Sequence, residues 1–584
     1  MYGTDRALHY SLMKRNRILL LAPVLLVFPL NSALHAQSEK PEATTPIQRW
    51  WNGKSALADW FGIGSVLKGS GLTVTGSYKQ GYYGQVSGGV PNEPKSNWAA
   101  EVKVKALYDF GKVFGLEGLT LESNWRYREV DGSQDTPYTA FEAGTGGASG
   151  MFNPNHISSG LGMRIMTQFL QWQSDKSKDP RFLINLGWMN PYEQFLQQPL
   201  SKLFENNAIE SNKGIGGQAG AGIPVWNGTK YVTYSTTPVP WSSSYASWGG
   251  SLRVKPSSDT YAMSGLYLAI SGFNGVQTSA WSPTQVYPYT SVSPSYLGKV
   301  RPGGYSQVST VNAAGQPTGK TARSSYVVPV QNNHGFNFQG AASFNPNGNG
   351  GLYQQNGLYN VNEFGWTPKF GREKLEGKYA IGGYIWGQNN TSFNPATYVV
   401  GQTKPTAFSQ NSVVWGLYLQ GDQRLYAAKE NGPASARVPS KEKGLYTFNM
   451  CTFTPPQNNA LPFYFQTGLV YKGLIPKRDT DSCGVALAAG FYSSYYNQYI
   501  DSQNQALRKA YNGSNATPAN TVANLPPNAY LPHFSSTEVV EAFYNFQINK
   551  WAAVNPYAQW IVNPAGNGVC ANDLVMGASV KVLF

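Results

Sequence analysis

The sequence predicts an all-β fold in which the chain closes into an antiparallel transmembrane β-barrel. Its last stretch alternates strictly, with apolar residues at every second position from Leu574 to Phe584 and Gly577, Ser579 and Lys581 between them. A period of two with one wholly apolar face is typical of a strand whose sides meet different environments. The pattern recurs in segments of roughly 10 residues, as in barrels that cross a membrane. Only 13% of residues are charged and 14% are aromatic, which suits a wall in contact with lipid.

The N-terminus predicts export. Lys14, Arg15 and Arg17 precede an apolar run from Ile18 to Leu30, and small residues follow up to Gln37. We interpret residues 1–36 as a signal peptide, residues 37–70 as a segment on the periplasmic side, and residues 71–584 as the barrel domain. The apolar run is shorter than the roughly 20 residues that a spanning helix needs. Any membrane crossing is therefore expected from strands.

Sixteen strands are expected. Their ranges are 71–80, 99–108, 117–128, 161–173, 180–188, 245–255, 260–272, 357–368, 378–388, 411–420, 443–454, 462–473, 483–495, 537–549, 555–563 and 572–584.

The connections between these strands alternate in length. The long ones are 129–160, 189–244, 273–356 and 496–536, and the short ones are 109–116, 174–179, 256–259, 369–377, 474–482 and 550–554. Long loops at one end, with tight turns and both termini at the other, are typical of an outer-membrane barrel with an even number of strands. The connection 421–442 breaks this rule. The Pro- and Gly-rich stretch 273–356 is interpreted as an exposed loop, with a linker between two domains as the alternative.

Charge and cysteines exclude several classes of site. The net charge of +14 comes from dispersed Lys and Arg residues, so we assign it to the field of a pore and expect no nucleic-acid partner. Cys451, Cys483 and Cys570 show no metal-ligand spacing, so no metal and no cofactor is expected. Cys483 begins a strand at the turn end, whereas the other two cysteines lie toward the loop end. A disulfide between Cys483 and either of them is not expected.

Local motifs, in order along the chain, carry a resemblance to a known family. They include Asp59–Gly62 (DWFG), Ser247–Gly249 (SWG), Gly473–Asp481 (GLIPKRDTD), and Glu538 and Glu541 before Pro556. They resemble the motifs of OprB-type carbohydrate-selective porins of Gram-negative outer membranes, from about Ser55 to Phe584. Gly64 stands where the family usually has Arg, and Tyr557 where it often has an acidic residue.

The resemblance implies an outer-membrane porin that lets monosaccharides and similar small solutes diffuse passively through a charged constriction. Its implied partners are small carbohydrates as solutes, with outer-membrane lipid and lipopolysaccharide around a monomer or homotrimer. The alternative is a soluble exported β-rich carbohydrate-active protein, a lectin or glycosidase. We expect no enzyme and no catalytic residues, because the chain has neither HExxH nor GxSxG and only five His.

Strand parity assigns the lumen face, which lies opposite the lipid face. In the third strand Leu121, Trp125 and Tyr127 are expected to point outward. The residues that alternate with them then face the lumen: Glu122, Asn124, Arg126 and Arg128. In the fourth strand the same rule turns Gln168 inward. Gln420, Asn545 and Gln559 are also expected to face the lumen. The candidate pore-lining, substrate-binding residues are Arg126, Arg164, Glu122, Arg128, Arg253, Glu363, Tyr418 and Glu541.

Arg126 and Arg164 lie on neighbouring strands and are the candidates for the narrowest plane. An inward Arg or Glu there supplies charge-assisted hydrogen bonds to sugar hydroxyls, and Tyr418 offers a ring on which a sugar stacks. The alternative for each is a solvated charge that only keeps the channel wet.

Two further segments are singled out. The stretch from Pro191 to Asn207 is expected either to fold into the pore or to pack on the outer rim. Residues 50–68, which include Trp50, Trp60 and Phe61, are interpreted as a cap against the periplasmic mouth.

Overall fold

The computed structural model describes part of the chain. The described residues are 45–57, 63–89, 96–130, 154–155, 162–175, 177, 179–210, 222–226, 231–235, 247–270, 307–311, 317–323, 356–392, 409–429, 439–457, 461–498, 501, 533–566 and 571–584. The chain divides into two compact units, residues 1–50 and residues 51–584, and the barrel belongs to the second.

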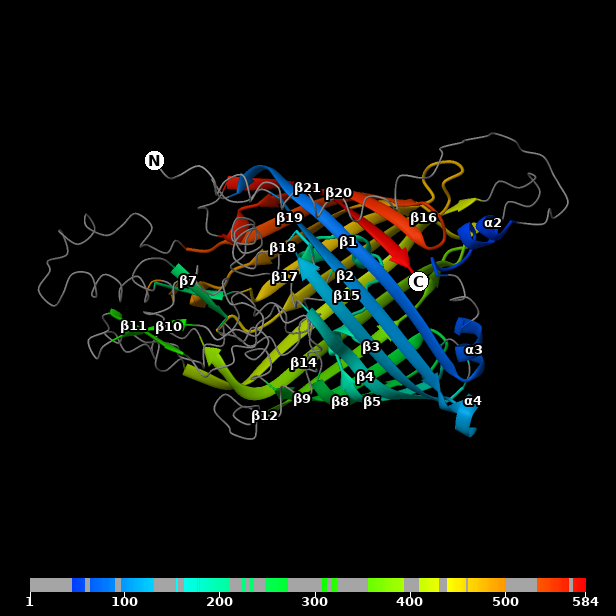
Figure 1. The fold of residues 1–584 in the computed structure, drawn as a ribbon, viewed down its shortest axis with the longest axis horizontal. Coiled ribbons are helices and arrows are strands. Elements are labelled where there is room, and N and C mark those ends of the chain that lie inside the picture. Colours follow the sequence, from blue (N-terminus) through cyan, green and yellow to red (C-terminus); the bar gives the residue numbers. More distant parts are fainter. Residues whose placement is uncertain are drawn as a thin grey trace, which may run out of the picture. The chain divides into compact units, whose positions relative to one another are not determined.

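The second unit is an antiparallel β-barrel (Figure 1). In chain order its sixteen strands are β1 (Leu72–Gly89), β2 (Ser96–Asp109), β3 (Leu119–Val130), β4 (Gly162–Gln173), β5 (Phe182–Met189), β8 (Ser247–Val254), β9 (Thr260–Ile270), β12 (Asn356–Trp366), β14 (Leu375–Ser392), β15 (Ser409–Lys429), β16 (Pro439–Phe453), β17 (Phe463–Lys472), β18 (Ser482–Phe491), β19 (Ser536–Gln547), β20 (Ala552–Val562) and β21 (Ala571–Leu583). A two-residue strand, β13 (Lys369–Phe370), pairs with β14.

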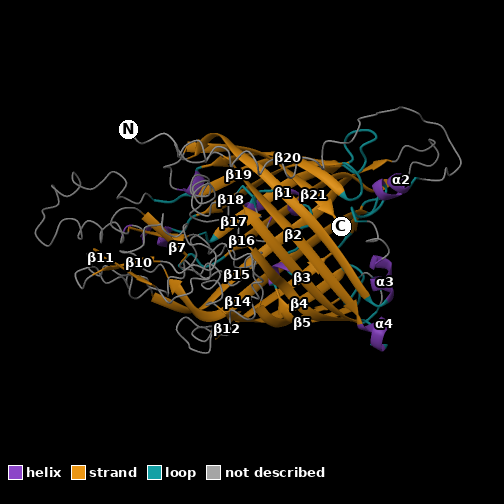
Figure 2. Ribbon diagram, viewed as in Figure 1, coloured by secondary structure: helices purple, strands orange, loops and turns teal. Residues whose placement is uncertain are grey.

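The barrel closes because β1 pairs with β21, from Ser77 opposite Leu583 to Gly89 opposite Ala571. Closure leaves no sheet edge, so the backbone groups are paired within the wall even where lipid surrounds it. The predicted sixteen-stranded fold is confirmed, and strands dominate the secondary structure (Figure 2).

The connection that broke the predicted alternation is shorter than expected. β15 continues to Lys429 and β16 starts at Pro439, so only residues 430–438, which lie outside the described residues, connect them. The pairing shifts between Arg424 and Tyr426. Such an irregularity interrupts the period of two, which explains why the sequence pattern did not reveal the extra length.

Long connections and short turns lie at opposite ends of the barrel. The long stretches 189–244 and 273–356 contain the hairpins β6 (Gly222–Trp226) with β7 (Tyr231–Ser235) and β10 (Gln307–Val311) with β11 (Pro317–Arg323). β7, β10 and β11 are drawn at the end away from α3 (Ile63–Gly69) and α4 (Phe110–Phe114) (Figure 1). β9 and β12, which flank the second stretch, pair directly. Residues 273–356 therefore connect neighbours in one sheet, and do not link two domains.

The two faces of the wall follow the predicted parity over most strands. Large apolar side chains such as Leu186, Ile385 and Met576 are more than half exposed on the outside, at 58%, 57% and 53%. Polar residues such as Arg126 and Gln559 point inward and are buried. An apolar outside and a polar inside are what a barrel in lipid requires. No helix in the described residues is long and apolar enough to cross a membrane.

The fourth strand breaks the predicted parity. Asn124 lies opposite Thr167 and Trp125 opposite Ile165, so Met166 is an extra residue in β4. A bulge of one residue reverses the alternation beyond it. Thr167 therefore faces inward, where its hydroxyl oxygen accepts a hydrogen bond of 2.6 Å from Asn124. Gln168 is exposed on the outside instead, so its predicted inward position is wrong.

Two residues near the start of the second unit contact the barrel. The ring of Trp51, the last residue of α2 (Pro46–Trp51), lies 6.1 Å from that of Trp551 in the turn between β19 and β20. The Ala56 N–H donates to the Leu583 carbonyl at 2.7 Å. Trp60 and Phe61 lie outside the described residues.

Two of the three cysteines are described, and both are free thiols. Cys451 lies on β16 opposite Phe465, and Cys483 lies on β18 opposite Tyr544. Cys570 lies outside the described residues.

The GLIPKRDTD motif forms the turn between β17 and β18. Arg478 donates two hydrogen bonds to Asp481, at 2.7 and 3.0 Å. The same carboxylate accepts from the Tyr544 hydroxyl at 2.9 Å and from the Gln547 N–H at 3.0 Å. Burial by itself raises the pKa of Asp481, but these bonds outweigh it and hold the pKa below its usual value. The turn is thereby fixed to β19, the next strand of the wall.

We expect Asp481→Asn to lower the free energy of unfolding by about 2 kcal/mol at neutral pH, because it removes charge-assisted hydrogen bonds in a buried position. Since the folded pKa is depressed, this stabilisation is complete above the pKa of the unfolded chain, about 3.9, and is lost as the pH falls through the folded pKa. Urea titration followed on unheated gels at pH 7 and pH 3 measures it. Asp479→Asn is the control, because Asp479 is exposed and, among the described residues, forms one surface ion pair, with Lys443. An equal loss at both pH values would contradict the role of the carboxylate charge.

Candidate functional site: the lumen and its inserted loop

The segment after β5 folds into the barrel. It comprises η5 (Pro191–Glu193), η6 (Ser201–Leu203) and α6 (Asn207–Glu210). Phe195, Leu196, Phe204, Ala208 and Ile209 are completely buried, at 0% exposure. Of the two placements expected from the sequence, inward folding is therefore correct. We call residues 190–210 the inserted loop.

Glu363 on β12 holds the first half of the inserted loop. Its carboxylate accepts a hydrogen bond from the backbone N–H of Leu196 at 2.7 Å. It also accepts from the hydroxyls of Tyr261, at 2.7 Å, and Tyr418, at 2.8 Å. Glu363 is buried, and hydrogen bonds from several donors are what a buried carboxylate needs.

Glu541 on β19 holds the second half in the same way. Its two oxygens accept from the consecutive N–H groups of Glu205 and Asn206, each at 2.7 Å. Gln559 on β20 adds a bond of 3.2 Å to the same carboxylate and donates to the Pro154 carbonyl. Asn206 in turn donates to Gln559 at 3.1 Å. The bend of the loop is thus held by Glu541 together with Gln559.

Polar side chains of the wall form hydrogen bonds with the middle of the inserted loop. Gln198 donates to Asp422 on β15 and to the Asn449 carbonyl on β16, both at 2.9 Å. Gln466 donates to Gln198 at 2.7 Å. Lys378 and Gln420 both donate to the carbonyl of Gln197 at 2.8 Å. These contacts tie the loop to the wall formed by β14 to β17.

Aromatic packing completes the attachment. The ring of Phe204 lies 4.7 Å from that of Phe543 and 5.6 Å from that of Phe448. Gly265 on β9 leaves space for the loop, since a Cβ there would lie 3.0 Å from the Phe195 ring and closer still to Tyr267. Because these contacts bury apolar surface, moving the loop away from the inner wall is energetically unfavourable.

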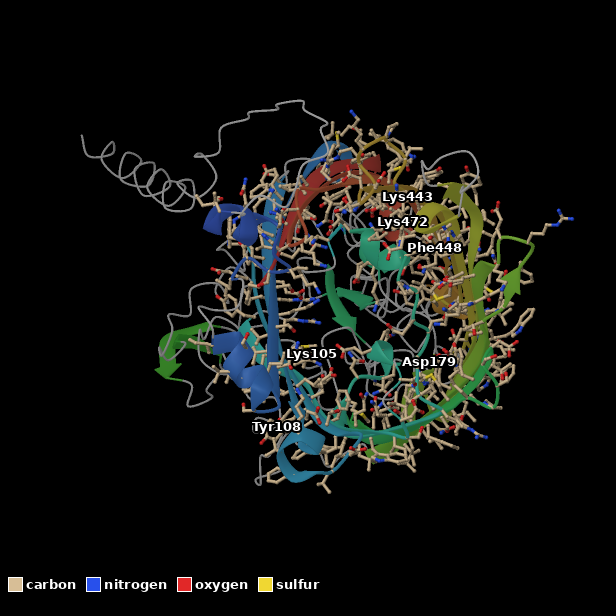
Figure 3. The ribbon with its side chains drawn as sticks, turned by 90° about the vertical axis from the view of Figure 1, so that its right-hand side faces the viewer. Lys105, Tyr108, Asp179, Lys443, Phe448 and Lys472 are labelled. Carbon is tan, nitrogen blue, oxygen red and sulfur yellow. The ribbon has the colours of Figure 1, made fainter. Side chains whose placement is uncertain are left out.

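A group of cations lies on the inner face of β21, β1, β2 and β3. We call it the basic wall; its members are Lys581, Lys79, Lys103, Lys105, Arg126 and Arg128. Lys79 lies opposite Lys581, and Lys103 lies opposite Arg126. Seen from the turn end, Lys105 lies inside the ring of strands and Tyr108 outside it (Figure 3).

Three carboxylates serve the basic wall. Glu101 is shared by Lys103 at 2.7 Å, Arg126 at 3.2 Å and Arg128 at 2.6 Å. Glu122 pairs with Lys105 at 2.6 Å. Glu205 of the inserted loop pairs with Lys79 at 2.9 Å and accepts from Ser579 at 2.7 Å. These carboxylates are largely buried, whereas the side chains of Lys103 and Lys105 are each 48% exposed. The charged groups that this wall exposes to the lumen are therefore mainly lysine ammonium groups.

Comparison with known proteins decides the family. The family described as carbohydrate-selective porin, OprB family, matches residues 98–584. The chain belongs to this family. The expected resemblance is confirmed over that range, and the DWFG segment lies before it. Family and fold are those of channels in the Gram-negative outer membrane, not of enzymes, and they do not favour the soluble alternative.

Two similar proteins give the extent of the likeness. Porin B of Pseudomonas aeruginosa is 25% identical over 224 residues, which are 38% of this chain and 44% of Porin B. The alignment thus spans less than half the length of that curated relative. The high-pH structure of Pseudomonas putida OprB has a TM-score of 0.60 at 18% identity and covers 91% of this chain and 99% of that one. It shares the barrel fold with this porin.

Four predicted site residues of the porin lie on β3 and β4. Arg126 points inward and is only 6% exposed, and Arg164 lies opposite it in the register, although its side chain lies outside the described part. Arg128 is buried against Glu101. Glu122 faces the lumen between Lys105 and Asn124. Arg126 and Arg128 thus belong to the basic wall, and Glu122 pairs with it through Lys105.

The other four face inward as predicted but have other contacts. Glu363, Tyr418 and Glu541 are buried beneath the inserted loop: the two carboxylates accept from loop N–H groups, and the Tyr418 hydroxyl donates to Glu363. Arg253 pairs at 3.1 Å with Asp179 in the turn before β5. Direct contact of these four residues with a solute stays a prediction.

Sequence reasoning missed the lysines of the basic wall. A signal was available in two places. Residues 101–105 (EVKVK) alternate charged and apolar side chains, and Lys581 lies on the face of the last strand that is opposite its apolar face. Glu193 and Lys202, which are exposed on the inserted loop, carried no such signal because loop residues have no parity.

Proposed function

We propose that this porin lets monosaccharides and similar small solutes diffuse passively between the basic wall and the inserted loop. The observation that carries the proposal is a loop held inside the barrel by two buried carboxylates, which narrows the lumen. The basic wall offers ammonium donors beside carboxylate acceptors. One such pair is Lys105 and Glu122, whose Nζ and Oε2 atoms lie 2.6 Å apart. Sugar hydroxyls both donate and accept hydrogen bonds, so they can bond to the ammonium group and to the carboxylate of such a pair in turn.

Arg126 and Arg164 are proposed to line the narrowest plane, with Glu122 and Arg128 beside them. Their positions opposite each other on adjacent strands and the inward direction of Arg126, which pairs with Glu101 on the lumen face, support this. A pore must release what it binds, so each contact is weak and exchangeable.

The state of the mature protein is part of the proposal. Residues 1–36 are removed as a signal peptide, residues 37–70 stay on the periplasmic side, and the barrel lies among outer-membrane lipid and lipopolysaccharide as a monomer or homotrimer. N-terminal sequencing of the protein purified from outer membranes, and its mass in detergent, test these points.

Conductance in a planar bilayer tests transport. Glucose titrated into the bath is expected to reduce the ion current until the effect saturates, because sugar occupies the constriction. In the double variant Arg126→Ala, Arg164→Ala we expect higher ion conductance and weaker sugar block. Arg372→Ala, in the exposed turn before β14, is the control. Unchanged conductance and block in the double variant would remove these two residues from the constriction, and no sugar effect in the wild type would oppose the proposed function itself.

A further inference from the structure

The basic wall carries more positive charge than its carboxylates neutralise. Its six cations are served by Glu101, Glu122 and Glu205, as the ion pairs show. One carboxylate, Glu101, faces three cations. In the described part of the lumen, the wall therefore keeps an excess of positive charge next to the path of a solute.

Lys581 contributes most directly to this excess. It is exposed and lies opposite Lys79 across the closure of the barrel. Lys79 has Glu205 within 2.9 Å, whereas Lys581 has no ion pair among the described residues. Two neighbouring ammonium groups, of which only Lys79 is paired with a buried carboxylate, favour a mobile anion in the lumen.

The inserted loop does not cancel this field. Its exposed ionisable side chains are Glu193 and Lys202, which are opposite in sign. Its other acidic residue near the wall, Glu205, is only 1% exposed and already counted. Glu193 acts electrostatically on Arg126 and Lys103 of the basic wall, and Glu210 at the end of the loop is half-buried. The loop therefore narrows the lumen and reduces the positive charge of the basic wall without cancelling it, because the six cations still outnumber Glu101, Glu122, Glu193, Glu205 and Glu210.

We infer that this porin passes sugar acids, meaning sugars that carry one carboxylate, faster than neutral sugars of the same size. The inference rests on the proposed function and adds the solute class. The carboxylate of such a solute is attracted by Lys581, Lys79 and Lys103, and its hydroxyls use the same donors and acceptors as a neutral sugar. A single negative charge is held weakly enough to be released, because the channel is wet.

Proteoliposomes loaded with equal concentrations of labelled glucuronate and glucose test the inference. The membrane potential is clamped at zero with potassium and valinomycin, and the ratio of the two initial efflux rates is measured. We expect a ratio above one at about 0.01 M salt that falls toward one at about 1 M salt, where charges are screened within about 3 Å.

Variants identify the groups responsible. Lys581→Gln and Lys103→Gln are each expected to lower the ratio about two- to threefold, the effect of one unit charge about 8 Å away in water. Lys581→Gln leaves no ion-paired carboxylate behind, and in Lys103→Gln the carboxylate of Glu101 keeps both arginines. Lys550→Gln, in the exposed turn between β19 and β20, should keep the wild-type ratio.

The outcomes separate this inference from the proposed function. If glucose leaves the liposomes but glucuronate lags behind it at low salt, the inference fails and the sugar channel stands. A ratio that neither lysine variant changes also overturns it. If neither solute leaves, the proposed function itself fails.

Discussion

Glu541→Ala is expected to widen the channel, raising single-channel conductance and weakening sugar block. Glu541 is completely buried and holds two consecutive N–H groups of the inserted loop at 2.7 Å. Hydrogen bonds to a charged acceptor contribute about 1.5–3 kcal/mol each. Without the carboxylate, two buried donors lose their acceptor, and they regain hydrogen bonds only if the loop moves into water. The closed barrel does not depend on this contact, so the wall should still assemble.

Single-channel recording measures the conductance, and the unheated mobility on a denaturing gel shows that the variant is folded. Glu541→Gln keeps one acceptor oxygen and places an amide donor against the second N–H, so an intermediate conductance is expected. Glu538→Gln is the matched control, since Glu538 lies three residues earlier on the same strand and on its opposite face. A folded Glu541→Ala barrel with wild-type conductance and sugar block would show that the carboxylate does not fix the loop.

The wall was predictable because the information that determines it is local. Each strand alternates residues by environment, so Met576, Val580 and Val582 identify the lipid face without knowledge of any partner. The same rule brought Glu122, Arg126 and Arg128 to the lumen. It failed at β4, because the bulge at Met166 adds one residue without leaving a signal in the alternation.

The interior was less predictable because its contacts are not local. Parity turned Glu363 and Glu541 inward but gave no reason to expect backbone donors from residues 196, 205 and 206. Ser579 illustrates the same limit: its face was correct, yet its hydroxyl is buried against Glu205 and does not meet open water. Which lumen residues touch solute depends on where the inserted loop lies, and that depends on contacts between distant parts of the chain.

Met576→Arg is expected to impair assembly of the barrel strongly. Met576 is 53% exposed on the outer face in the middle of β21, the strand that closes the barrel against β1. A charge on the lipid face costs about 2–4 kcal/mol near the midplane of the bilayer. The penalty falls on the closing strand, so the unclosed edge of β1 would remain exposed to aggregation.

The yield of folded barrel in outer membranes, judged by the difference in gel mobility between heated and unheated samples, measures this loss. Lys581→Arg is the matched control: it places the same side chain on the same strand but on the lumen face, where Lys581 is exposed to water. Because strand parity alone separates the two positions, the pair tests the register of β21 and not a general intolerance of arginine. Equal yields from the two variants would mean that the outer face of β21 does not meet lipid.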